Sequence, residues 1–244
     1  MNVSKTQYMV FSGKKREDHL VNIKIDGNTL TRVYTSKFLG IMFDDKLTWK
    51  EHINYIGKKI SKGLGIIKKA RKCLTSESLL SLYYSFIYPY LIYCNQIWGN
   101  VSSSSLHKLI ILQKRAVRII SGVPPRTHTP PLFSKLNIIE IEKLNKYLVG
   151  QLMFKYHKKK LPNIFDGFFV LNSNIHQYET RHRNDLHYPR IKTELGKRSV
   201  RYWGVQVWNA IISTNISLEV TPGTFKKNLK KELLNDALVF PVYD

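Results

Sequence analysis

Apolar residues change their spacing along this chain, and the change separates two kinds of secondary structure. Near the N-terminus, QYMVF is short and apolar, while VNIKI places Val21, Ile23 and Ile25 on one face. Asp26-Gly27-Asn28 is a tight-turn signal, so TLTRVY is expected to return as a partner strand. KFLGIMF is predicted to be a more continuously apolar and better-buried strand. Residues 7–43 therefore predict a small antiparallel sheet.

The period becomes helical after Asp44. Apolar residues then recur every three or four positions, which places them on one face of a helix: Trp49, Ile53, Ile56, Ile60, Leu64 and Ile67. Thr48 is expected to cap this helix, with Glu51 three residues later completing a capping box.

Further helices follow from the same spacing. Pro89 bends or interrupts the next one, and Gly122 with the VPP sequence ends another. The predicted ranges are about 76–88, 102–122, 138–158, 199–212 and 224–234, with a long loop and a short strand or two at 162–200. The fold class is α+β: a small antiparallel sheet followed by a mainly α-helical region.

The charge balance points to an anionic partner. Lysine and arginine number 39 against 17 acidic residues, which gives a formal net charge of +22. Nucleic acid is the first candidate and an anionic membrane surface the second. The residues predicted to contact phosphates lie in an acid-free helical run, on a following helix and in the loop region: Lys58, Lys59, Lys62, Lys68, Lys69, Arg71 and Lys72; Lys114, Arg115 and Arg118; Arg181 and Arg183.

One long uncharged stretch raises the question of a membrane. No residue from 78 to 106 is charged, but Pro89 and several tyrosines favour a buried helix pair over a membrane span. The aromatic side chains there, and Trp203 and Trp208 further on, are interpreted as core rather than as base-stacking groups. Two cysteines cannot form a disulfide framework, so an intracellular protein, nuclear or cytoplasmic, is expected.

Two groups of residues invite a metal interpretation. Asp44 and Asp45 follow a strand-like run, but two-metal phosphoryl transfer requires carboxylates from separated strands. They are interpreted as a polar turn before a helix. His176, His182, Asp185 and His187 lie among arginines that would repel a divalent cation, so this loop is expected to meet phosphates and bases instead. No metal site is predicted.

Several blocks, in order, resemble one family. NVSKTQYMVF and FLGIMFDDKLTWKEHI resemble the end of the palm of reverse transcriptases from non-LTR, LINE-type retrotransposons. LYYSFIYPYLIYCNQIWG, LQKRAVRIISG, HTPPLF and GKRSVRYWGVQVWN resemble the thumb and C-terminal region of the same proteins, of the jockey/CR1 kind. The order and spacing of the blocks make the resemblance specific.

The resemblance implies a division of the chain and a function. It implies a palm-end β segment at 1–47, a helical thumb-like region at 48–122 and a nucleic-acid-binding C-terminal region at 123–244. In the family the catalytic pair lies in a Tyr-Ala-Asp-Asp box upstream of the Lys-Thr block, and that box would precede Met1. The expectation is therefore a truncated RNA-directed DNA polymerase without catalytic residues.

The resemblance also suggests partners. We expect RNA and DNA as template–primer duplex, together with the upstream palm and fingers of a parent polymerase. No cofactor is expected in this fragment, although Mg²⁺ is implied for the intact polymerase. No membrane is expected. A stand-alone, non-enzymatic RNA- or DNA-binding protein remains the alternative.

Overall fold

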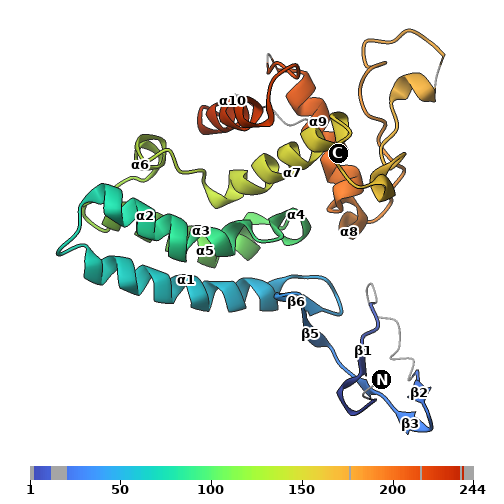
Figure 1. Ribbon diagram of the computed structural model, residues 1–244, viewed down its shortest axis with the longest axis horizontal. Helices are drawn as coiled ribbons and strands as arrows, with labels where there is room; N and C mark the ends of the chain where they lie inside the picture. Colours follow the sequence, from blue (N-terminus) through green and yellow to red (C-terminus); the bar gives the residue numbers. More distant parts are fainter. Residues whose placement is uncertain (1–2, 12–20, 176, 215, 237, 239–244) are drawn as a thin grey trace.

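A computed structural model describes residues 3–11, 21–175, 177–214, 216–236 and 238, and it shows a small β region attached to stacked helices (Figure 1). The α+β prediction is confirmed. The α-helices are α1 Lys50–Ala70, α2 Ser76–Phe86, α3 Tyr88–Ile92, α4 Asn95–Trp98, α5 Ser103–Ser121, α6 Pro130–Lys135, α7 Ile141–His157, α8 Glu194–Lys197, α9 Val200–Ile212 and α10 Pro222–Leu234.

The helix positions agree with those expected from the apolar spacing. Pro89 lies in the first turn of α3 and separates it from α2, and Gly122 ends α5 in a left-handed conformation. In the described part of the predicted loop at 162–200, the short strands expected there are reduced to an isolated bridge between Leu171 and Leu186. The same range contains 3₁₀ turns at Asn163–Phe165 and Asn172–Asn174 and the short helix α8. A further 3₁₀ turn spans Val3–Lys5.

The strands are shorter than expected and form separate pairs instead of one antiparallel sheet. β1 (Gln7–Tyr8) runs parallel to β4 (Thr31–Arg32), whereas β2 (Lys24–Ile25) and β3 (Asn28–Thr29) are antiparallel. β5 (Thr35–Phe38) and β6 (Ile41–Asp44) form the third pair, which is also antiparallel. The predicted turn before Asn28 is present, with positive φ at Asp26 and Gly27.

The prediction of one buried strand over KFLGIMF was wrong, because the chain reverses in its middle. Leu39 and Gly40 both have positive φ and connect β5 to β6 as a tight hairpin. Phe38 and Leu39 are 63% and 74% exposed. The Tyr93 hydroxyl donates a hydrogen bond to the Leu39 carbonyl at 2.7 Å, which fixes the hairpin tip against the end of α3.

The prediction that Thr48 is the N-cap of α1 differs from the structure, in which Trp49 holds that position without a side-chain cap bond and Thr48 Oγ1 accepts only a 3.5 Å hydrogen bond from the Lys50 N–H. The turn that leads into the helix is fixed by Asp44, at the end of β6. Its two carboxylate oxygens accept hydrogen bonds from the backbone N–H groups of Thr48 and Trp49, each at 2.8 Å. Trp49 has a left-handed backbone, which is costly for a bulky residue, and its ring packs 5.3 Å from that of Phe43. The buried Asp44 carboxylate therefore holds the entrance to α1.

The helices bury their apolar faces in two neighbouring clusters. The first contains the predicted stripe of α1, with Leu64 at its edge, together with buried residues of α2, α3, α4 and α5. The second joins α7 to α9 and α10 and includes Phe154 stacked 4.1 Å from Phe225. α7 contributes to both clusters, with Ile141 and Leu144 in the first and Met153 in the second.

Close helix contacts depend on two glycines. A Cβ at Gly63 of α1 would lie 2.8 Å from the carbonyl oxygen of Phe86, at the end of α2. A Cβ at Gly150 of α7 would lie 2.8 Å from methyl groups of Ile211 and Leu229. Both distances are too short for carbon, so these helices pack this closely only because the positions lack side chains.

The first prediction compares two isoleucines of α1. Ile60 is 1% exposed and Ile66 is 44% exposed. Ile60→Asp should lower the free energy of unfolding by about 3 kcal/mol or more, because it buries an unpaired charge. Ile66→Asp, on the exposed side of the same helix, should cost far less. Denaturant unfolding of both variants measures the difference, and equal losses would contradict the assigned helix faces.

The second prediction concerns pH and His52. This side chain is 1% exposed, and burial lowers its pKa from 6.5 to about 4. The unfolded chain therefore binds more protons than the folded chain between these values, so stability is lost as the pH falls from 6.5 to 4. In His52→Gln this loss should be shallower in denaturant unfolding measured across that range. A decline as steep as that of the parent would contradict the assignment.

Candidate nucleic-acid interface

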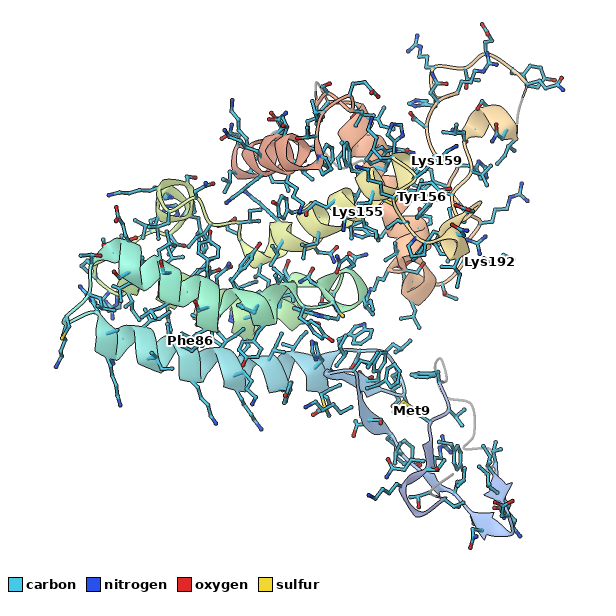
Figure 2. All side chains as sticks on the ribbon, in the orientation of Figure 1. Met9, Phe86, Lys155, Tyr156, Lys159 and Lys192 are labelled. Carbon is cyan, nitrogen blue, oxygen red and sulfur yellow. The ribbon has the colours of Figure 1, made fainter. Side chains whose placement is uncertain are left out.

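The basic residues of α1 lie on the outside of the helix stack. Lys58, Lys59, Lys62, Lys68 and Lys69 are all exposed, while the apolar face of the same helix is buried. Figure 2 shows long side chains leaving α1 on the side away from the other helices. The positive charge is therefore available to a partner along the whole length of the helix.

A groove between α1 and α5 collects basic residues from both helices. It has a volume of ≈ 870 Å³, and its lining includes Lys68, Arg71, Lys114, Arg115 and Arg118. Ile111, Val123 and Pro125 supply apolar surface between them. Among the described residues no acidic side chain lies within ion-pair distance of these five cations. We call this feature the α1–α5 groove.

The two helices run in the same direction, and this places their basic C-terminal turns together. The Lys108 ammonium donates to the Asn54 side chain at 3.2 Å near their beginnings, and an Arg71 nitrogen lies beside Gly122 at their ends. The C-terminal end of a helix carries partial negative charge, which favours neighbouring cations. Arg118 also fixes the loop that follows α5, because its Nε donates a hydrogen bond to the Thr127 carbonyl at 2.8 Å.

The structure brings together five of the twelve predicted phosphate contacts and leaves the others apart. Lys58, Lys62, Lys69 and Lys72 remain exposed on or just beyond α1, and Lys59 lies 5.8 Å from the Tyr55 ring. Arg181 and Arg183 lie in the loop after α7, at the end of the molecule opposite the C-terminal turn of α1 (Figure 1). Arg183 also forms an ion pair with Glu179.

The residues considered for metal binding make other contacts in the part of the chain that the structure describes. The Asp44 carboxylate is occupied by backbone amides, and the Asp45 N–H donates to the Tyr34 carbonyl at 3.0 Å. His182 contacts the Asp185 carboxylate at 2.7 Å and His187 contacts Asn172, while His176 lies outside the described residues. Within the described ranges, no three His, Cys, Asp or Glu side chains come together as potential metal ligands.

The aromatic stretch between α2 and α4 is divided between core and surface. Tyr83 and Trp98 are fully buried, as interpreted from the sequence. Phe86, Tyr90 and Tyr93, in contrast, are 37–50% exposed. Trp208 is buried as well. In the part of the chain that the structure describes, no helix combines the length and apolar character that crossing a membrane requires.

Known proteins similar to this chain are of the kind that the sequence blocks resemble. The chain is 26% identical, over 65% of its length, to an RNA-directed DNA polymerase from the mobile element jockey of Drosophila funebris. It is 30% identical over 51% of its length to the jockey polymerase of Drosophila melanogaster, and 24% identical over 76% to a probable polymerase from the X-element transposon of that species. The chain is thus similar to RNA-directed DNA polymerases of jockey-type mobile elements.

The similarity covers a small part of each relative. The chain spans 17%, 14% and 18% of the length of these three polymerases. No family model matches the chain, and no solved structure matches it. The proteins to which the chain is similar are therefore polymerases of mobile elements, and the similarity is confined to a small part of each.

The third prediction tests the α1–α5 groove by salt dependence. If six phosphates are neutralised, the slope of log affinity against log salt should be about −5 for duplex binding. Replacing the exposed Lys68, Arg71 and Arg115 with Ala should make the slope shallower by up to about 3. Fluorescence anisotropy with a labelled RNA–DNA duplex at several salt concentrations measures both slopes.

The control removes the same charge from another face. Lys226, Lys227 and Lys231 are exposed on α10, on the opposite side of the helix stack from α1 (Figure 1). Their triple Ala variant has the same net charge as the groove variant. It should keep most of the parent slope, and an equal reduction in both variants would show that binding does not involve a particular surface.

Proposed function

We propose that this chain binds template–primer duplex as part of a reverse-transcriptase-related protein and does not itself hold the catalytic metal ions. The observation that carries the proposal is the α1–α5 groove, in which five cations on or next to two parallel helices surround apolar surface, with no ion-pair partner among the described residues. Such a surface suits a backbone of phosphates and does not depend on base sequence.

The net charge supports a polyanionic partner. An excess of +22 over 244 residues repels itself in the folded state unless anions neutralise it. The exposed lysines of α1 extend the groove along the helix, so contacts with several successive phosphates are geometrically possible. The relatives are polymerases named for directing DNA synthesis from RNA, which makes an RNA–DNA hybrid or an RNA duplex the first ligand to test.

The position of Asp44 supports a binding role instead of a catalytic one. A metal ion would have to compete for carboxylate oxygens that already accept two backbone N–H groups, and their loss would open the entrance to α1. Two-metal phosphoryl transfer also needs further carboxylates nearby. In this proposal Mg²⁺ is held by other residues of a complete polymerase, and this chain positions the duplex.

The fourth prediction combines catalysis with stability. The chain should extend no primer when supplied with dNTPs and Mg²⁺ or Mn²⁺, and neither should Asp44→Asn or Asp45→Asn. Asp44→Asn should nevertheless lower the free energy of unfolding by about 1–3 kcal/mol, since it weakens the acceptor for two buried amides. Asp45→Asn, a half-buried neighbour, should change stability much less.

Primer-extension assays and denaturant unfolding of the three proteins test these expectations together. Extension by the parent chain that disappears in Asp44→Asn, without a loss of stability, would identify a metal site and overturn the proposal. Failure of the parent chain to bind any duplex at low salt would overturn the binding role as well.

A further inference from the structure

The loop between α7 and α8 is fixed to the helices at several points. The Tyr156 hydroxyl of α7 donates to the Phe169 carbonyl at 2.9 Å. The Asn209 side chain of α9 accepts from the Leu186 N–H and donates to the Leu186 carbonyl, both at 2.9 Å. Backbone hydrogen bonds also join the two arms of the loop, for example from the His187 N–H to the Val170 carbonyl at 2.7 Å. These hydrogen bonds therefore hold the loop against α7 and α9.

This loop forms one side of an open cavity, whose other side is the end of α7 and one side of α9. The cavity has a volume of ≈ 740 Å³, within the range of about 300–1,000 Å³ that is usual for small-ligand sites. Aromatic rings form much of its lining: Tyr156, Phe165, Phe169 and Trp208. Leu161, Leu171, Leu186 and Leu218 add aliphatic surface. Figure 2 shows Tyr156 and Lys159 at the end of α7 that faces the loop.

The cavity also contains exposed polar groups that the fold does not use. Asn174 and Asn184 line it, and among the described residues their side-chain amides form no hydrogen bond. Lys159 and Asp166 line it too, and within the same part of the chain neither forms an ion pair. Each amide can donate and accept, the Lys159 ammonium adds one positive charge, and the Asp166 carboxylate adds one negative charge and can accept hydrogen bonds. These exposed groups are therefore available to a ligand in the cavity.

We propose that this cavity receives an unpaired purine or pyrimidine base of a bound nucleic acid, with a flanking phosphate near Lys159. A base offers flat faces to the aromatic lining and donors and acceptors at its edge to the two amides. The proposal rests on the nucleic-acid binding proposed above and adds a preference for bases displaced from a duplex.

The surroundings supply charge complementarity for the flanking backbone. Lys155 and Lys160 are exposed next to Lys159 in the chain, and no acidic residue occurs from 155 to 160. Arg181 is exposed in the loop between α7 and α8, which lines one side of the cavity. Two of the predicted phosphate contacts, Arg181 and Arg183, therefore belong to the part of the molecule that carries this cavity, far from the α1–α5 groove (Figure 1).

The test uses three labelled RNA duplexes that differ at one position. The first carries a single bulged adenosine, the second an abasic residue at the bulge, and the third is fully paired. The parent chain should bind the bulged duplex about tenfold more tightly than the abasic one, because one stacked base is gained. Asn184→Phe should fill the mouth of the cavity and abolish this difference, while binding of the paired duplex is unchanged.

A matched control and a fourth ligand complete the experiment. Asn163→Phe makes the same change at an exposed asparagine that does not line the cavity, and it should keep the tenfold preference. A fluorescent purine nucleotide tests whether a free base and phosphate enter the cavity without a strand. Its binding should be weak and sensitive to Asn184→Phe but not to Asn163→Phe.

The outcomes separate the two proposals. Equal binding of the bulged and abasic duplexes by the parent chain would overturn the base-binding proposal and leave the duplex-binding proposal standing. Loss of the preference in both Phe variants would overturn it as well. Absence of binding to any duplex would overturn the duplex-binding proposal, and the nucleotide would then decide whether the cavity binds a base on its own.

Discussion

The buried amide of Asn145 in α7 is the interaction on which the arrangement of the helices most depends. It donates to the Asn95 carbonyl of α4 at 2.8 Å and accepts from the Trp203 indole N–H of α9 at 2.7 Å. Gln113 of α5 acts similarly at the start of α7, where it accepts from the Ile141 N–H and donates to the Ile139 carbonyl. Buried polar groups tolerate few alternative partners, so these amides set the register between the two apolar clusters.

The two proposed binding surfaces lie on opposite sides of this fixed centre. The α1–α5 groove belongs to the first cluster, and the cavity at the end of α7 belongs to the second. α7 contributes side chains to both clusters, so it connects the part of the fold that carries the groove to the part that carries the cavity.

Local patterns predicted the helices well because apolar spacing and terminal signals act over a few residues. The stripe from Ile53 to Ile67 and the end of α5 at Gly122 are examples. The hairpin at Leu39 was missed because leucine seldom adopts positive φ. The hydrogen bonds of the Asp44 carboxylate were missed because their backbone donors lie four and five residues away. The groove and the cavity are each formed by segments that are distant in the sequence. The runs of lysine therefore predicted that the surface is basic, but they did not predict which residues come together in a groove or a cavity.

The parallel packing of α1 and α5 also determines how the chain can acquire its structure. The contact between Asn54 and Lys108 joins residues 54 positions apart, and the stripe of α1 is covered only when both α2 and α5 are present. Non-local contacts of this kind slow folding, because a long loop must close first. While the chain is being synthesised, α1 therefore passes through a period in which its isoleucines are exposed beside a dense row of lysines. Anionic polymers that meet the protein during that period would encounter an amphipathic basic helix before they encounter a groove.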